Sequence, residues 1–287
     1  MAATKAEFLE LVGLESLVDL DRLRDMAFYG IPPSIRGEIW MILIPALVVS
    51  TEDERIALPT LSTEDFEDST ATDEFFSDSD VLRVLKTELS KYGRRNLFKS
   101  LKQQERMRLL LIAYLKRYPS MWHVHHAALI HILGPLVLVM KRESDVLASL
   151  TLLMCAIDST FSPFKGRQVL GRFLMLFRSR LPVLFTHFEE EDLEASRWAA
   201  PWLQWLLCRE LPMDCCLRLW DSYLAAPDGH GFSLHSFVCL AILENCQADL
   251  IELENQELMA FLQHLPSFDM ERIILQAQYL AHDFRNT

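Results

Sequence analysis

The sequence has few glycines, 9 among 287 residues, and little strand-like alternation of polar and apolar residues. Apolar residues instead recur at helical spacing along most of the chain. Hydrophobic residues make up 51% and charged residues 24% of the chain, a balance typical of globular proteins with a sizeable core. The sequence therefore predicts an all-α protein.

Several common functional motifs are missing. The chain contains no GxGxxG, GxxxxGK[ST], HExxH or GxSxG pattern, so nucleotide binding, zinc-protease chemistry and serine-hydrolase chemistry have no support. The six cysteines form no CxxC pair and lie in apolar, helix-like surroundings. We interpret them as reduced, buried thiols rather than as a disulfide or metal framework, and we expect no cofactor.

Long apolar runs are also missing. The longest apolar stretch, residues 127–140, is interrupted by His131 and by Gly134-Pro135, and it is shorter than the roughly 20 residues of a membrane span. Acidic residues interrupt the N-terminal segment where a signal peptide needs an apolar stretch. We expect residues 127–140 to form a buried core helix. We also expect a cytoplasmic protein without a transmembrane segment, associated with endomembranes through its partners.

The formal net charge of -12 is unevenly distributed. Residues 51–80 carry 11 acidic residues and one basic residue and are rich in serine and threonine, which predicts an acidic flexible loop. Residues 81–117 carry 11 basic and two acidic residues. A chain so acidic overall is a poor nucleic-acid binder. The basic stretch is either a solvated helix face or a dock for an acidic protein surface.

The clearest helix is predicted within residues 211–226. Cys216, Leu219, Trp220 and Tyr223 fall at positions i, i+3, i+4 and i+7 and form one apolar stripe. Pro212 suits the first turn of this helix. Further helices are predicted over residues 97–118, 144–157 (with Ser144 or Asp145 as the N-cap), 168–180, 232–246 and 270–282.

One cluster of histidines raises the question of a metal site. His123, His125 and His126 lie close together, His131 is nearby, and His123 and His126 could share one helix face. A zinc site needs a third or fourth ligand at suitable spacing, and this segment offers no carboxylate or thiol. We therefore expect ordinary histidines and no metal.

Five segments occur in a fixed order that together points to a family. They are GIPPSIRGEIW (30–40), LKTELSK (85–91), YLKRYPSMWHVHH (114–126), WLQWLLCRELPMDCCLRLWD (202–221) and FLQHLPSFDMERIILQA (261–277). This order resembles the TBC domain, the helical module that accelerates GTP hydrolysis by Rab-type GTPases. The resemblance covers about residues 30–278. It implies a TBC-domain fold of two packed helical lobes, over 30–161 and 162–287, after an N-terminal helical extension over 1–29.

The resemblance implies a catalytic mechanism with two groups inserted into the GTPase. One is the arginine of an I-x-x-D-x-x-R motif, which neutralises charge on the transferring phosphoryl group, an effect typically worth about 10³–10⁵ in rate. Here that motif reads Leu85-x-x-Glu88-x-x-Lys91, so lysine replaces arginine and brings the charge without the planar fork. Arg94 or Arg95 could substitute for Lys91 only if the segment shifted by about one helical turn.

The second catalytic group implied by the family is the glutamine of a Y-x-Q motif, which orients the attacking water. Here the motif reads His123-Val124-His125, so His125 stands at the glutamine position. Trp122 and His126 stand where the family usually has glycine, which permits a turn that bulky residues resist. We expect this segment to continue as a helix. With four departures around one site, no residue is assigned a catalytic role.

The scaffold positions of the family pattern, by contrast, are kept. We expect Trp40 and Trp220 to be core residues, and Arg36 and Asp221 to be helix-end or ion-pair residues. The positions that match the family pattern are Arg36, Trp40, Trp202, Pro212, Trp220 and Asp221.

A kept scaffold without its catalytic pair predicts an adaptor or subunit that binds a partner protein in a GTPase-activating complex. The partner is either a small GTPase or a coiled-coil subunit whose helix lies in a groove between TBC helices. In length and missing catalytic pair, the chain is also similar to the small TBC subunit of the tuberous sclerosis complex. The alternative is an active Rab GTPase activator that uses a variant pair, Lys91 (or Arg94 or Arg95) with His125. A third hypothesis is an effector that binds a GTP-loaded GTPase without hydrolysis.

Overall fold

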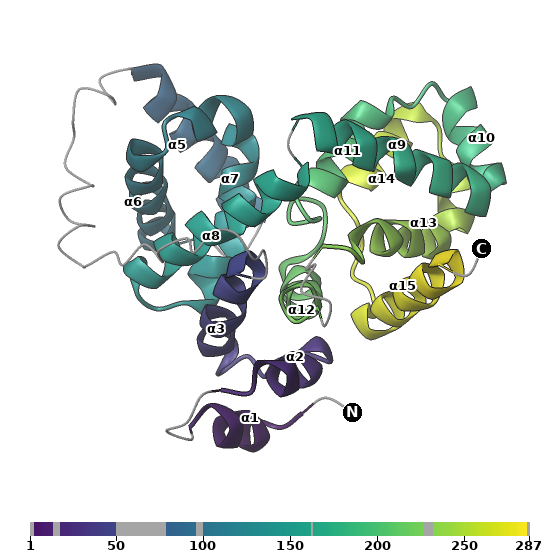
Figure 1. Ribbon diagram of the computed structural model, residues 1–287. Coiled ribbons are helices and arrows are strands. Elements are labelled where there is room, and N and C mark those ends of the chain that lie inside the picture. Colours follow the sequence, from purple (N-terminus) through teal and green to yellow (C-terminus); the bar gives the residue numbers. More distant parts are fainter. Residues whose placement is uncertain are drawn as a thin grey trace. The chain divides into compact units, whose positions relative to one another are not determined.

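The structure, a computed structural model, describes residues 3–13, 18–49, 79–95, 100–161, 163–226 and 232–285 (Figure 1). All fourteen regular elements within these ranges are α-helices, and none of the described residues lies in a strand. The predicted all-α class is therefore confirmed. The chain divides into two compact units, one of residues 33–155 and one of residues 1–32 together with 156–287. The TBC lobe boundaries given above stay a prediction.

In the unit of residues 33–155, α7 is the central helix. It packs against α3, α5 and α6 and is apolar around its whole circumference, as expected of a buried helix. Its buried residues include Ala128, Leu129, Ile130, Ile132, Leu133 and Leu136. The predicted core helix over 127–140 is thus confirmed, although it begins earlier. The helices of this unit are α3 (Arg36–Val49), α5 (Ser79–Arg95), α6 (Leu101–Arg117), α7 (Ser120–Val139) and most of α8 (Glu143–Phe161).

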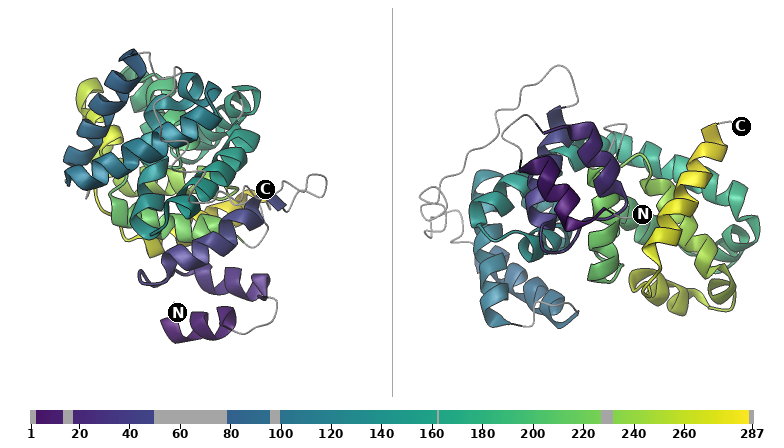
Figure 2. Two further views of the ribbon diagram at one scale, coloured as in Figure 1. Left: turned by 90° about the vertical axis from the view of Figure 1, so that its left-hand side faces the viewer. Right: turned by 90° about the horizontal axis from the view of Figure 1, so that it is seen from below.

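In the other unit, α13 packs against α9, α10, α11 and α15, and its packing against α15, which lies beside it, is the most extensive of these (Figure 1). The N-terminal helices α1 and α2 lie side by side, as the right-hand view of Figure 2 shows. Helix α2 packs on α12, which groups residues 1–32 with this unit. Its helices are α1 (Lys5–Val12), α2 (Leu20–Phe28), α9 (Pro163–Arg180), α10 (Pro182–Glu190), α11 (Ala195–Gln204), α12 (Met213–Leu224), α13 (His235–Ile251), α14 (Asn255–Gln263) and α15 (Met270–Arg285).

Several helix starts differ from the sequence-based expectation: α9 begins at Pro163 rather than at residue 168, α13 at His235 rather than at residue 232, and α6 at Leu101 rather than at residue 97. Helix α8 begins at Glu143, so Ser144 and Asp145 lie within its first turn and neither is the N-cap. Asp145 instead forms an ion pair with Arg142. Nη2 of Arg142 lies 2.8 Å from Oδ1 of Asp145. Pro212 is the N-cap of α12 rather than a first-turn residue, because its ψ of 148° is extended.

Two further expectations meet the structure in part. The acidic loop over 51–80 lies outside the described residues except for Ser79 and Asp80, which open α5. All six cysteines are free thiols, but Cys155 is exposed rather than buried, since α8 turns this position toward solvent.

Among the described residues, α8 is the one helix long and apolar enough to cross a membrane, and 56% of that stretch is buried inside the structure. Core helices of globular proteins meet the same criteria, so this finding is weak evidence for a span. The absence of a transmembrane segment therefore stays a prediction.

Candidate functional site

Lys91, which the resemblance places at the position of the family's catalytic arginine, lies in the fourth turn of α5. Its Nζ is 2.7 Å from Oε1 of Glu88, one helical turn earlier. The side chain of Lys91 is 56% exposed, and an exposed ion pair of this kind stabilises a fold by at most about 1 kcal/mol. The ammonium of Lys91 is therefore held loosely on the surface of the helix.

The next residue, Tyr92, fixes the position of α5 against α7. Its side chain is buried, and its ring meets the ring of His131 edge to face, with centroids 5.0 Å apart. Its hydroxyl occupies the space beside Gly134, where an added Cβ would lie 1.8 Å from the hydroxyl oxygen. This close contact specifies which turn of α5 faces α7. It thereby fixes the position of Lys91 along the axis of α5 relative to α7.

The position that the resemblance assigns to the family's catalytic glutamine lies in α7. The backbone of residues 120–139 is helical throughout, so His125 stands within the second turn, as the sequence predicted. Six residues separate His125 from His131, which places His125 roughly 9 Å along the helix axis from the Tyr92 contact. The side chains of residues 120–127 lie outside the described part of the structure, as do those of Arg94 and Arg95.

The described residues include no group of three or more histidine, cysteine, aspartate or glutamate side chains that could hold a metal ion. His131 is described and packs on Tyr92. His123, His125 and His126 belong to the part of α7 whose side chains are not described. The expectation of ordinary histidines in this cluster stays a prediction.

The Arg-x-x-x-Trp pattern begins α3. Arg36 is the first residue of this helix, and Trp40, one turn later, is fully buried. Between them, Gly37 lies against the C-terminal end of α7, because an added Cβ would come within 2.2 Å of the Val139 carbonyl oxygen. The pattern therefore places a core tryptophan and allows close helix packing, as a scaffold role requires.

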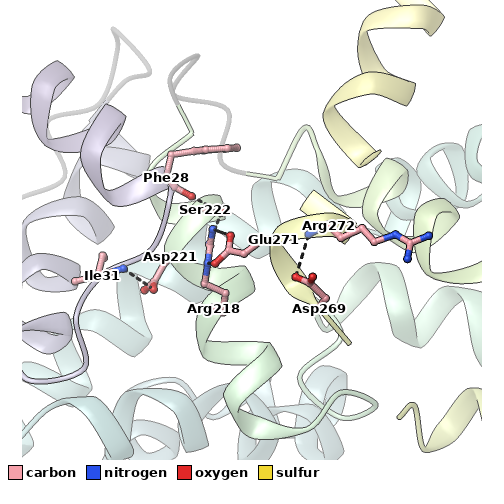
Figure 3. Close-up of polar contacts among 8 residues, drawn as sticks. All are labelled: Phe28, Ile31, Arg218, Asp221, Ser222, Asp269, Glu271 and Arg272. Atoms are coloured by element: carbon pink, nitrogen blue, oxygen red, sulfur yellow. Dashed lines mark hydrogen bonds and ion pairs between the residues drawn. The ribbon is translucent and has the colours of Figure 1, made fainter. Parts of the chain in front are cut away.

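The Arg-Leu-Trp-Asp segment of α12 forms a polar network with the end of α2 and the start of α15 (Figure 3). Asp221 is fully buried, and its Oδ2 accepts a 3.0 Å hydrogen bond from the backbone N–H of Ile31. The hydroxyl of Ser222 donates to the carbonyl oxygen of Phe28 at 2.7 Å. Two consecutive residues of α12 thus bind the chain that leaves α2.

Arg218 connects the same network to α15. Its Nη1 donates to Oγ of Ser222 at 2.8 Å, and its Nε donates to Oε1 of Glu271 at 2.7 Å. Glu271 lies in the first turn of α15, next to the N-cap Asp269, whose carboxylate accepts from the N–H of Arg272 at 3.3 Å (Figure 3). Such a cap and an acidic first turn favour a helix start here.

Of this network, Asp221 was expected from the sequence, whereas Arg218, Ser222 and Glu271 were not. Arg218 lies inside the recognised motif, so its spacing of three from Asp221 was visible in the sequence. Its partner Glu271 is 53 residues away, and no local spacing rule predicts that pair. Asp221 lies in the last turn of α12, as expected of a helix-end residue.

Two further scaffold residues, Trp202 and Trp220, lie in the core of the unit of residues 1–32 and 156–287. Trp202 and Trp220 are buried, and Nε1 of Trp202 donates to the Leu262 carbonyl oxygen at 2.9 Å. Near them, the buried His235 bridges two groups. Its Nε2 lies 2.8 Å from the Trp202 carbonyl oxygen, and its Nδ1 lies 2.6 Å from the hydroxyl of Tyr223.

The hydrogen bonds of His235 define its tautomer. A carbonyl oxygen only accepts, so Nε2 carries the hydrogen and Nδ1 accepts from the hydroxyl of Tyr223. Burial lowers the pKa of His235 from 6.5 to about 4, and the backbone acceptors oppose this shift only in part. His235 is therefore a neutral core residue near pH 7, which suits a structural role.

Comparison with known proteins places these features in a family context. The family model described as the Rab-GTPase-TBC domain matches residues 33–251. Human TBC1 domain family member 22A is 25% identical over 281 residues, which cover 87% of this chain and 53% of that protein. GTPase-activating protein gyp1 of Schizosaccharomyces pombe is 24% identical over 291 residues, covering 88% of this chain and 55% of that protein. The chain spans about half the length of these curated relatives.

Two solved structures share the fold. The Ypt/Rab-GAP domain of Gyp1p matches with a TM-score of 0.76 at 21% identity, covering 97% of this chain and 98% of that one. The Chlamydomonas flagellar RabGAP TBC domain matches with a TM-score of 0.71 at 19% identity, covering 98% and 91%. At this identity the likeness supports the fold alone, and it confirms the fold class expected from the sequence.

Proposed function

The chain belongs to the Rab-GTPase-TBC domain family, and from this premise we propose that it regulates small GTPases as a binding subunit without a catalytic pair of its own. The observation that carries the proposal is the lysine at the position of the family's arginine, paired with Glu88 on an exposed face of α5. The departures at the second position, His125, support the same conclusion.

Lysine replaces the charge of arginine but not its geometry. A guanidinium donates two parallel hydrogen bonds to phosphate oxygens, whereas an ammonium is a compact, strongly hydrated point charge. A phosphoryl-transfer transition state spreads its charge over several oxygens, so the fork is the part that matters. Lys91 would have to leave Glu88 and lose hydration for a poorer contact.

Neither Arg94 nor Arg95 readily takes the place of Lys91. For Arg94 or Arg95 to take the position that Lys91 has relative to α7, α5 would have to move along its axis by roughly 4.5–6 Å. This distance corresponds to three or four residues at about 1.5 Å each. Such a shift would remove the Tyr92 hydroxyl from the space beside Gly134 and break its ring contact with His131. The packing that holds α5 therefore opposes the substitution.

His125 differs from glutamine in both shape and hydrogen-bonding capacity. A neutral imidazole offers one donor and one acceptor on a rigid ring, whereas a glutamine amide offers a carbonyl acceptor and two donors. A misplacement of about 1 Å in a catalytic group can reduce the rate by about 10²-fold. Trp122 and His126 on either side add bulk where the family usually has glycine.

A scaffold retained without a catalytic pair leaves binding as the function. The partner in this proposal is a small GTPase or a coiled-coil subunit of a GTPase-activating complex. As part of the same proposal, the chain acts as the small TBC subunit of the tuberous sclerosis complex does, by binding a partner rather than by catalysis. The kept scaffold residues support it, since buried Trp40, Trp202 and Trp220 maintain the fold whether or not catalysis occurs.

Substitution of the two positions tests the proposal. In single-turnover GTP hydrolysis by a Rab-type GTPase, we expect Lys91→Ala and His125→Ala to leave the rate unchanged. Lys86→Ala is the matched control, since Lys86 is another exposed lysine of α5. The active alternative is correct instead if the protein accelerates hydrolysis and Lys91→Ala abolishes that acceleration while Lys86→Ala does not.

Binding to GTPases in defined nucleotide states separates the remaining hypotheses. An effector would bind a GTP-loaded GTPase more tightly than the GDP-loaded form, whereas a coiled-coil adaptor would bind its partner regardless of nucleotide. Purification from the native source without any coiled-coil protein would count against the adaptor form of the proposal.

A further inference from the structure

A groove of about 790 Å³ lies in the unit of residues 1–32 and 156–287, and none of the positions considered above lines it. It runs between α9, the N-terminal end of α13 and the C-terminal end of α15. Phe173, Met175 and Leu176 of α9, Phe237 of α13 and Phe284 of α15 form its apolar lining. We call it the α9–α15 groove. Its volume falls in the range of roughly 300–1,000 Å³ that is usual for binding pockets.

Two large apolar side chains at this groove face solvent. Met175 is 74% exposed and Phe284 is 57% exposed. The ring of Phe284 lies against that of Phe237, with centroids 6.0 Å apart, so it extends the apolar lining to the surface. Burying these side chains in a complex would be favourable by roughly 25 cal/mol for each Å² removed from water. Methionine suits such a surface because its flexible side chain adapts to different partners.

The charge around the groove is positive although the whole chain carries -12. Helix α9 has five basic residues and no acidic residue between Pro163 and Arg180. Arg172 lines the groove and is exposed, whereas Arg180, at the other end, is paired with Asp283. The N-terminal end of α13 adds the partial positive charge of a helix start, together with the hydroxyls of Ser233 and Ser236.

We propose that the α9–α15 groove binds an acidic amphipathic helix of a partner protein. Bulky apolar side chains one turn apart on the partner helix would enter between Met175 and Phe284, and its flanking carboxylates would meet Arg172 and the start of α13. From Arg172 to Arg180 the groove runs along roughly 12 Å of α9, eight residues at 1.5 Å each, which matches about two turns of a partner helix. This surface does not depend on the state of Lys91 or His125.

The positive charge around the groove favours an acidic partner helix over a basic helix or a membrane surface. A basic amphipathic helix would be repelled by Arg172 and the other bases of α9. Membrane binding normally uses a broad face of basic residues around an apolar helix face, whereas here the apolar residues line a concave groove. A like-charged partner costs binding energy, so charge complementarity gives specificity as well as a faster encounter.

The test uses two designed 18-residue helical peptides as probes. Both carry leucine at i, i+3, i+4 and i+7; one has glutamate at the other positions, and the second has lysine there. Fluorescence anisotropy with the full chain measures binding of each peptide. We expect the glutamate peptide to bind and the lysine peptide to bind at least tenfold more weakly.

Four variants locate the site. Arg172→Glu and Met175→Asp should each weaken binding of the glutamate peptide at least tenfold. Arg167→Glu on α9 and Leu275→Asp on the outer side of α15 are the matched controls and should leave binding unchanged, since both residues are exposed and neither lines the groove. All four positions are exposed, and circular dichroism checks that each variant stays folded.

Several results would overturn the proposal. These are no binding of the glutamate peptide, equal binding of both peptides, or equal losses in the groove and control variants. Met175-dependent binding to phosphatidylserine vesicles without peptide binding would show a membrane surface instead. Met175-dependent dimerisation in sedimentation, again without peptide binding, would show a second copy of the chain. The GTP hydrolysis measurements above are separate, so failure of either proposal leaves the other standing.

Discussion

Gly30 has a backbone φ of 106°, in a region that residues with a Cβ rarely adopt. An added Cβ there would also lie 3.1 Å from Nε of Arg218, within the network that joins α2, α12 and α15. We therefore expect Gly30→Ala to lower the free energy of unfolding by about 1–3 kcal/mol, the cost of a strained backbone position. Urea denaturation followed by circular dichroism measures this change.

Gly171 provides the control for Gly30. It lies within α9, and an added Cβ there would meet nothing within 4 Å. Gly171→Ala should be neutral or stabilise by up to about 1 kcal/mol, because alanine favours a helix more than glycine does. Equal effects at Gly30 and Gly171 would contradict the role assigned to Gly30.

Also at the residue scale, the sequence showed which positions keep the family pattern but not how they act. The motif predicted Trp40 and Trp220 as core residues, and both are buried. It could not predict that Asp221 binds the backbone of Ile31, because that contact joins residues far apart in the chain. That a lysine stands at position 91 was visible in the sequence. The packing of Tyr92 against Gly134 became apparent only from the structure.

At the scale of elements, Arg106 of α6 joins the end of α7 to the start of α8. It donates hydrogen bonds to the carbonyl oxygens of Val137, Met140 and Lys141. Its Nε lies 2.9 Å from Oε1 of Glu143 in the first turn of α8. These carbonyls lie at or just beyond the C-terminal end of α7, where backbone acceptors lack helical partners, and one guanidinium satisfies all three.

We expect Arg106→Met to lower the free energy of unfolding by about 1–3 kcal/mol, because part-buried acceptors lose their donor. Among the described residues, the neighbouring Arg108 binds Glu105 alone, in a surface pair with an N–O separation of 2.6 Å, so Arg108→Met should cost no more than about 0.5 kcal/mol. Chemical denaturation of both variants measures the difference. A loss at Arg108 as large as at Arg106 would show that the helix-end contacts contribute little.

Helix boundaries show where sequence patterns were insufficient. The Gly134-Pro135 pair was interpreted as an interruption of the apolar stretch, yet α7 continues through it to Val139. Proline inside a helix costs about 3 kcal/mol, but α7 is buried by three neighbouring helices whose packing outweighs that cost. Prolines also lie inside α3 and α11, at Pro45 and Pro201. Tertiary packing of this kind is invisible to a local pattern.

At the scale of the whole molecule, His235 makes stability depend on pH. Its pKa is lowered from 6.5 to about 4 in the folded state, first by burial. Between about pH 4 and pH 6.5 the unfolded chain binds a proton at His235 that the folded chain does not. The stability that neutral His235 contributes to the fold is therefore fully present above about pH 6.5. It is lost as the pH falls toward about 4, and its full size is on the order of 3 kcal/mol.

His235→Gln should therefore reduce the loss of stability between pH 7 and pH 4.5, although it lowers stability at pH 7 by removing the contact with Tyr223. His264→Gln, at an exposed histidine, should keep the slope of the unsubstituted protein. Urea denaturation across this pH range measures both slopes. If His235→Gln retained the original slope, the acid sensitivity would come from other groups.

We propose that this TBC-family chain keeps the scaffold of a GTPase activator without a working catalytic pair. Single-turnover GTP hydrolysis by a panel of Rab-type GTPases, with and without the protein at high concentration, tests it most directly. We predict that no member of the panel hydrolyses GTP faster when the protein is added. Acceleration of any member, removed by Lys91→Ala, would contradict the claim and show an activator that uses lysine in place of arginine.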